Sequence, residues 1–312
     1  MLALLNGCGE PATSSALNHQ GGVATPARSP ETLFDGEKAY ALLNAQCDIG
    51  PRYPGSAGHV KMRDWLVAEA KKHTDKVETQ EFRHRWSRTG ESVTMWNVVG
   101  RMDFGAQKTV LLLAHWDTRP YADQDPSPQN RSKPILGAND GASGVALLLE
   151  LTRVFKEKKP PVNVVFLFTD GEDLGPGLDE MFLGAEHFAR NLSEEDRKIS
   201  YGILLDMVGD RDLVIPREQN SDYYVRTLMD RFYGHAREIG LSKHFPNRPG
   251  PVIADDHEPL NRAGIPTIDL IDFDYGPGHS WWHTVEDTPD KCSAASLSAV
   301  GRAVESFLRA ES

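Results

Sequence analysis

The stretch VNVVFLFTDGEDLG, residues 162–175, decides the fold of this chain. Its first half is a nearly continuous apolar run, which is typical of a strand buried on both faces of a parallel sheet. The run ends abruptly in three acids, Asp170, Glu172 and Asp173. Because desolvating a carboxylate is costly, acids at the end of a core strand indicate a partner that compensates their charge.

Strands and helices alternate on both sides of this stretch. This order predicts an α/β fold: a single domain with a mixed, mostly parallel central sheet and helices on both faces. Ligands bind such sheets beyond the carboxyl ends of the strands. We expect strands at 76–84, 92–102, 109–117, 162–170, 199–210 and 265–272, and helices at 36–48, 57–73, 141–158, 185–192, 221–240 and 293–310.

Size and charge restrict the class of protein. The chain has 312 residues and a formal net charge of -11, and it contains no block rich in Lys or Arg. We therefore expect neither nucleic acid nor an anionic membrane surface as its main partner. We place the folded domain at residues 34–312.

Residues 1–33 differ in composition from the rest of the chain. MLALLNGCGE is a short apolar run whose Leu-Asn-Gly-Cys ending is similar to a bacterial lipoprotein signal, in which Cys8 would carry a lipid anchor. Residues 9–33 would then be a flexible tether. We expect an exported protein, periplasmic or on the outer surface and otherwise monomeric; a terminus without any targeting role is the alternative. No other stretch is apolar and long enough to span a bilayer.

Side chains that bind metals follow several expected strands. Carboxylates and imidazoles together suit Zn²⁺ or a similar divalent cation, which makes clustered acids favourable. Glu172 and Asp173 are consecutive, so their side chains diverge, and one can bind the metal while the other acts as a general base. The candidates are His115, Asp117, Asp140, Glu172, Asp173, Asp206 and His283.

Each of these residues also has an ordinary explanation. Asp140 could cap the helix at 141–158, and His115 or His283 could be a surface or core histidine. Five ligand-type residues at consecutive strand ends nevertheless favour a metal site over coincidence.

Several segments, in order, resemble the zinc aminopeptidase superfamily, and within it the animal-type glutaminyl-peptide cyclotransferases and their bacterial relatives. The resemblance runs from about Gln46 to the C-terminal helix. The segments are AHWDTRPYADQDP, KPILGANDGASGVALLLEL, FTDGEDLG, MFLGAEHFARN, YGILLDMVGD, IADDHEPLNRAGIPTIDLID and WWHTVEDT.

The resemblance implies a role for each matching residue. Asp140, Asp173 and His283 would be zinc ligands, and Glu172 the catalytic acid/base. Asp206 and Asp255 would form a hydrogen-bonded acid pair, and Trp282 would line the substrate pocket. His115 and Asp117 match the position that helps to hold a second metal. One departure is Asp173, where many relatives have Glu.

The implied reaction converts the N-terminal Gln of a peptide or protein to pyroglutamate and releases ammonia, with one zinc per chain. A two-zinc aminopeptidase is the alternative, in which His115, Asp140 and Asp206 would bind the second ion. Asp255, Trp282 and the similarity of the HWDTRP segment to bacterial cyclases favour the cyclase. A non-catalytic surface lipoprotein is a third alternative.

Other features keep more than one interpretation. Asp255 and Asp256 could cap a helix that begins near His257, and Trp281 and Trp282 could be packing aromatics. We expect the polar loop at 121–134 to shape the entrance to the site, whereas Arg119 receives no role. Cys47 and Cys292 could pair or remain separate thiols.

Overall fold

The computed structural model describes residues 31–311, which build one six-stranded sheet in the order β1-β2-β4-β3-β5-β6. β4, β3, β5 and β6 are mutually parallel, while β1 and β2 are antiparallel to each other and β2 is antiparallel to β4. The mixed, mostly parallel sheet is therefore confirmed. The strands are β1 (Lys76–Arg85), β2 (Ser92–Met102), β3 (Thr109–His115), β4 (Asn163–Thr169), β5 (Ile199–Asp206) and β6 (Thr267–Ile271).

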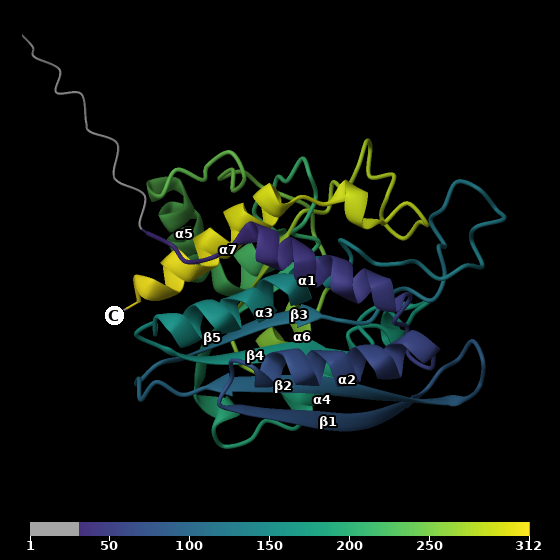
Figure 1. Ribbon diagram of the computed structural model, residues 1–312, viewed down its shortest axis with the longest axis horizontal. Coiled ribbons are helices and arrows are strands. Elements are labelled where there is room, and N and C mark those ends of the chain that lie inside the picture. The colour runs from purple at the N-terminus through teal and green to yellow at the C-terminus, as the bar shows by residue number, and fades with distance from the viewer. Residues whose placement is uncertain (1–30, 312) are drawn as a thin grey trace, which may run out of the picture.

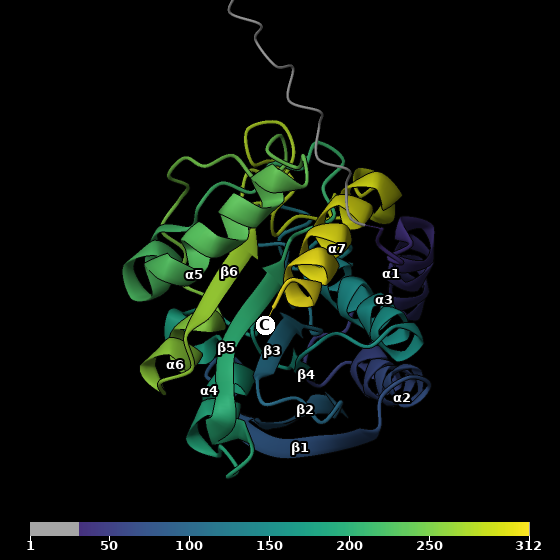
Figure 2. The same ribbon diagram turned by 90° about the vertical axis from the view of Figure 1, so that its left-hand side faces the viewer.

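Helices cover both faces of the sheet (Figures 1 and 2). α1, α2, α3 and α7 form the layer on one face, and α4 and α6 lie on the other. α5 packs beside β6 and α7. The helices are α1 (Gly36–Ile49), α2 (Ala57–Lys71), α3 (Ala142–Glu157), α4 (Leu183–Arg190), α5 (Gln219–Glu238), α6 (His257–Arg262) and α7 (Ala294–Arg309), with short 3₁₀ turns at Leu178–Glu180, Asp196–Lys198 and Pro289–Lys291.

The side chains of β3 show why the central strands are apolar throughout. Val110 and Leu112 belong to the core under α1, α3 and α7. Leu111 and Leu113 point to the opposite face and pack in the cluster that contains Phe188 of α4. Since successive residues of a strand face opposite sides, a sheet that is covered twice needs apolar residues at both parities.

Side chains close the exposed edge of the sheet at β6. The amide oxygen of Asn261 accepts the Thr267 N–H at 2.9 Å, and the Ser221 hydroxyl oxygen accepts the Asp269 N–H at 2.9 Å. These contacts satisfy backbone donors that would otherwise be available to a strand of another molecule.

The folded body begins slightly earlier than predicted. The Glu305 carboxylate of α7 accepts the backbone N–H groups of Leu33 and Phe34, each at 2.9 Å to Oε2, and Phe34 is buried against Gly301. Leu33 thus belongs to the domain and not to the tether. The predicted signal, Cys8 and most of the tether lie outside the described residues. Within residues 31–311, no helix combines the length and the apolar character that a membrane span requires.

Candidate metal centre

The predicted ligands meet at the carboxyl ends of the three central parallel strands. His115 ends β3, Asp206 ends β5, and Glu172 and Asp173 follow β4. Two groups of potential ligands each have one atom per residue within 4.8 Å of the others. Asp140, in the turn before α3, belongs to both groups. The groups are Asp140–Asp173–His283 and His115–Asp140–Asp206.

The first group has the donors of a zinc site. His283 Nε2 lies 3.1 Å from Asp173 Oδ1 and 3.4 Å from Asp140 Oδ2. Asp140 Oδ2 and Asp173 Oδ2 are buried without a hydrogen-bond partner among the described residues. Buried oxygen atoms without a donor, next to an imidazole, fit a divalent cation. The chemistry of this donor set therefore suits zinc.

The protonation of these ligands reflects their crowding. Burial, and then the Asp173 carboxylate, raise the pKa of Asp140 to about 7. Burial also opposes ionisation of Asp173, but His283 outweighs it and lowers the pKa of Asp173 to about 2. Burial disfavours the charged form of His283, but Asp173, Asp123 and Asp140 together raise its pKa to about 9.

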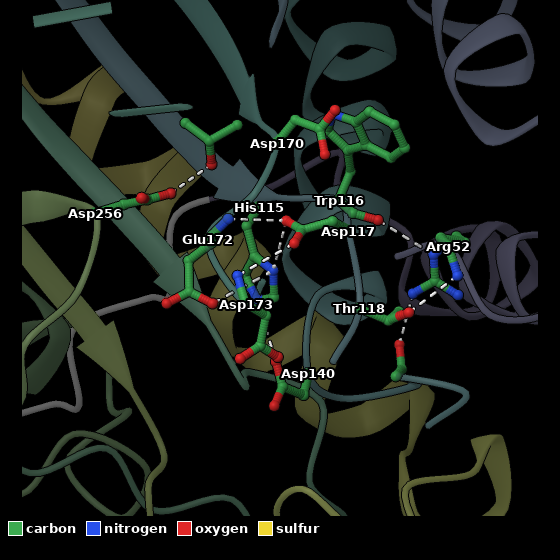
Figure 3. A network of polar contacts seen from close by, with 12 residues as sticks. Arg52, His115, Trp116, Asp117, Thr118, Asp140, Asp170, Glu172, Asp173 and Asp256 are labelled. Carbon is green, nitrogen blue, oxygen red and sulfur yellow. Dashed lines mark hydrogen bonds and ion pairs between the residues drawn. The ribbon is translucent and has the colours of Figure 1, made fainter. Parts of the chain in front are cut away.

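The second group centres on His115. Its Nε2 lies 3.2 Å from both Asp140 Oδ1 and Asp206 Oδ1. Asp117, which the resemblance also places near a second metal, is absent from this group. Its carboxylate instead accepts the backbone N–H groups of Glu172 and Asp173, both at 3.1 Å, as Figure 3 shows. Asp117 therefore fixes the turn that carries these two acids.

Glu172 diverges from Asp173, in agreement with the expectation from the sequence. It belongs to neither ligand group, and its Oε2 lies 3.8 Å from His115 Nδ1. Burial and the neighbouring Asp173 carboxylate raise the pKa of Glu172 well above its ordinary value. An acid with a raised pKa beside a metal site is suited to carry protons.

The predicted hydrogen bond between Asp206 and Asp255 is not formed. Asp255 Oδ1 accepts the Asp256 N–H at 2.6 Å, while Oδ2 has no hydrogen-bond partner among the described residues. The two acids still interact, because burial, followed by the Asp206 charge, raises the pKa of Asp255 well above its ordinary value. Asp255, in the segment before α6, is therefore close enough to Asp206 for their charges to repel, but the two carboxylates do not share a hydrogen bond.

The helix-cap explanations are wrong for these acids. Gly141 occupies the N-cap of α3, and no side chain accepts a capping hydrogen bond there. Asp256 stands at the N-cap of α6 but its side chain caps no backbone N–H; it accepts a hydrogen bond from the Thr169 hydroxyl instead. The Asp140 carboxylate is therefore available to bind a metal ion.

Asp170, the first acid of the quoted stretch, points away from the site (Figure 3). Its two carboxylate oxygens lie 2.9 and 2.8 Å from Nε2 of His59 in α2, and one oxygen accepts the Trp96 N–H at 2.7 Å. His59 in turn stacks on Trp116, with ring centroids 4.7 Å apart. This acid is compensated by a histidine, which the sequence did not reveal because the partners are 111 residues apart.

Asp287 is a further residue that the sequence analysis missed. Its carboxylate accepts the backbone N–H groups of Asn139 at 2.8 Å and Asp140 at 3.2 Å, and the Tyr275 hydroxyl at 2.7 Å. It thus holds the Asp140 turn as Asp117 holds the Glu172–Asp173 turn. The one available signal was its place four residues after His283 in WWHTVED.

Arg52 contacts the backbone of the loop before Asp140 and the backbone at the end of β3. This fully buried guanidinium donates to the carbonyl oxygens of Trp116 at 3.2 Å, Leu136 at 2.9 Å and Gly137 at 2.8 Å. It joins the end of β3 to the loop that leads to Asp140 (Figure 3). The GPRYPGS segment therefore contributes a positioning residue that its loop-like composition concealed.

The two adjacent tryptophans have different surroundings. Trp282 stacks on His283, with ring centroids 3.8 Å apart, and also contacts Phe273. Trp281 packs against Tyr275 and Gly276. Trp282 thus lies against a candidate ligand, whereas Trp281 is a packing aromatic. Cys47 and Cys292 are buried free thiols in this structure.

Comparison with known proteins supplies the family. Residues 97–308, which include every candidate ligand, match Peptidase family M28. The chain belongs to peptidase family M28. The glutaminyl cyclase of Bacteroides thetaiotaomicron, solved with bound N-acetylhistamine, matches this M28 chain with a TM-score of 0.85 and 34% identity, covering 89% of this chain and 99% of that one.

Two curated relatives of this M28 protein carry different names. The glutaminyl-peptide cyclotransferase-like protein of Mus musculus is 26% identical over 284 residues, covering 82% of this chain and 71% of the relative. Aminopeptidase YwaD of Bacillus subtilis (strain 168) is 27% identical over 279 residues, covering 85% of this chain and 55% of the relative. The names of these relatives correspond to the two activities that the sequence suggested.

Proposed function

We propose that this protein is a zinc-dependent glutaminyl-peptide cyclotransferase, which converts the N-terminal Gln of peptides or proteins to pyroglutamate. The observation that carries the proposal is the similarity to the Bacteroides thetaiotaomicron glutaminyl cyclase over 99% of that chain. The Asp140–Asp173–His283 group and the separate acid Glu172 supply the groups that the reaction requires.

The zinc ligands and Glu172 have separate roles in the proposed reaction. Asp140, Asp173 and His283 would hold the zinc ion, which would supply Lewis acidity toward the side-chain amide carbonyl of the substrate. Glu172 accepts a proton from the attacking α-amine and gives it to the departing ammonia. The new C–N bond closes the ring as the amide C–N bond breaks. Since the attack is intramolecular, holding the substrate in a reactive conformer contributes much of the rate.

The other acids affect the protonation of Glu172, and Trp282 provides a surface for the substrate. After burial and the Asp173 carboxylate, Asp255 and Asp256 add to the charge repulsion that raises the pKa of Glu172 and favours its protonated form. Trp282 offers an aromatic surface beside His283, against which a substrate side chain can pack. We assign one zinc ion to each chain.

A two-zinc aminopeptidase is the second candidate, and the His115–Asp140–Asp206 group favours it. A second ion there would leave Glu172 to take a proton from water. The cyclase is preferred because solved relatives named glutaminyl cyclases recur among the matches, at 34% identity in Bacteroides thetaiotaomicron and 35% in Tannerella forsythia, alongside a leucine aminopeptidase precursor of Bacteroides thetaiotaomicron at 34%.

Mass spectrometry of a peptide that begins Gln-Phe, incubated with zinc-loaded protein, separates the two candidates. The cyclase predicts loss of ammonia from an otherwise intact peptide. Release of free glutamine would refute the proposal in favour of the aminopeptidase. An unchanged peptide with a zinc-free protein would favour a non-catalytic role.

We further propose export with a lipid anchor on Cys8, which the Leu-Asn-Gly-Cys sequence supports. Metabolic labelling with a fatty acid should mark the wild-type chain and leave Cys8→Ser unlabelled. Equal labelling of both chains would overturn the assignment.

A further inference from the structure

Two charged residues of the HWDTRPYAD segment lie directly behind the candidate ligands. Arg119 is buried and Asp123 is about one-third exposed, with a side-chain exposure of 35%. Neither belongs to a ligand group. The inference below deepens the proposed function, because it rests on metal binding by Asp140, Asp173 and His283.

Asp123 faces the nitrogen of His283 that points away from the other ligands. Its Oδ1 lies 3.4 Å from His283 Nδ1, while Nε2 of the same ring faces Asp140 and Asp173. A histidine that binds a metal through one nitrogen is commonly oriented by a carboxylate at the other. Asp123 occupies the place of that carboxylate.

Arg119 connects Asp123 to a second ligand. Its Nη2 donates to Asp123 Oδ2 at 2.8 Å, and its Nη1 lies 3.5 Å from both Oδ1 and the carbonyl oxygen of Asp173. Arg119 thus joins Asp123, beside His283, to the ligand Asp173 through one guanidinium group.

The backbone fastens the same loop to the same ligand. The Gln124 N–H donates to the His283 carbonyl oxygen at 3.2 Å. His283 has a left-handed backbone with φ of 53°, which is unfavourable for a non-glycine residue. The surroundings must hold it there: Asp123 lies beside its ring at 3.4 Å, and the Gln124 N–H donates to its carbonyl oxygen.

We infer that Arg119 and Asp123 form a positioning pair that orients His283 and Asp173 toward the metal. Through Asp123, the loop at 121–134 then contributes to metal binding. The sequence had indicated only that this loop shapes the entrance to the site. The interaction suits an Arg specifically, because one planar guanidinium must reach a carboxylate and a second acid together.

The test compares zinc affinity, measured by competition with a chromophoric chelator, in wild type, Asp123→Ala, Asp123→Asn and Arg119→Lys. Asp123→Ala should weaken zinc binding by about tenfold or more, in the range found for outer partners of metal ligands. Asp123→Asn keeps an acceptor oxygen and should lose less. Arg119→Lys keeps the positive charge but cannot contact Asp123 and Asp173 through two nitrogens. Its zinc affinity should also lie between those of wild type and Asp123→Ala.

Asp125→Ala is the matched control. Asp125 holds the same loop through Ser127, Asn130 and Val285 but touches no ligand side chain. The inference predicts that this variant keeps the wild-type zinc affinity within about threefold. Unchanged affinity in Asp123→Ala, or an equal loss in Asp125→Ala, would overturn it. Wild-type protein that binds zinc but does not cyclise Gln-Phe peptides would instead refute the proposed function alone.

Discussion

Glu172 and Asp173 are neighbours in the chain, yet their carboxylates have different partners. Asp173 faces His283 at 3.1 Å, while Glu172 stays outside both ligand groups. The turn held by Asp117 makes this separation possible. A ligand and a proton carrier can therefore be only one residue apart.

Glu172→Gln should keep zinc and lose turnover. The amide preserves the shape of the side chain but cannot carry the proton, so we expect ammonia release to fall by about 10²- to 10⁴-fold. Zinc content by elemental analysis should equal that of wild type. Activity close to wild type would mean that another group moves the proton.

Asp140 and Asp206 give a matched pair of variants that counts the metal ions. Asp140 belongs to both ligand groups, whereas Asp206 belongs only to the one with His115. Asp140→Ala should lose bound zinc altogether, because Asp173 and His283 alone are a poor site. Asp206→Asn should retain one zinc per chain. A drop from two ions to one in Asp206→Asn would identify a two-metal enzyme.

At the scale of elements, the sequence predicted much more than it missed. Apolar runs identified the central strands, whose two faces are buried, whereas alternation of polar and apolar residues identified β1, which has no buried residue. The residues at strand ends, such as His115 and Asp206, could be found because parallel strands bring their carboxyl ends together. The roles of Asp170 and Asp287 could not be assigned from the sequence. Asp170 pairs with His59 and Asp287 accepts the Asp140 N–H, and both contacts join residues that are distant in sequence.

Asp287→Asn tests whether a buried carboxylate holds the Asp140 turn. An Asn has one acceptor oxygen, so either the Asn139 or the Asp140 N–H loses its partner, at a cost of about 1–3 kcal/mol of unfolding free energy. Zinc affinity should fall as well, because Asp140 is no longer fixed. Asp290→Asn, at a nearby side chain that is 69% exposed, is the control and should change stability little. Equal stability of Asp287→Asn and wild type would contradict this role for the turn.

At the scale of the whole molecule, the acidic balance of the chain extends beyond the metal centre. The chain has a net charge of -11, and further acids such as Asp210, Asp272 and Asp274 lie in a hollow near Trp281. Asp272 is buried there and accepts the Val214 N–H at 2.7 Å. Such groups make stability depend on pH independently of catalysis.

Asp272 should make the zinc-loaded protein less stable as pH rises toward neutrality. Burial, and then the Asp210 charge, raise the pKa of Asp272 from 3.8 to about 7. A raised pKa contributes stability that is fully present below the unfolded value and is lost as pH rises through the folded value. Asp272→Asn should therefore exceed wild type in unfolding free energy at pH 8, by up to about 4 kcal/mol, and the gain should shrink toward pH 5. Denaturant unfolding at both pH values measures this, with Asp64→Asn, an exposed substitution, as the control. A gain that is equal at both pH values would show that lost charge at Asp272 is not its cause.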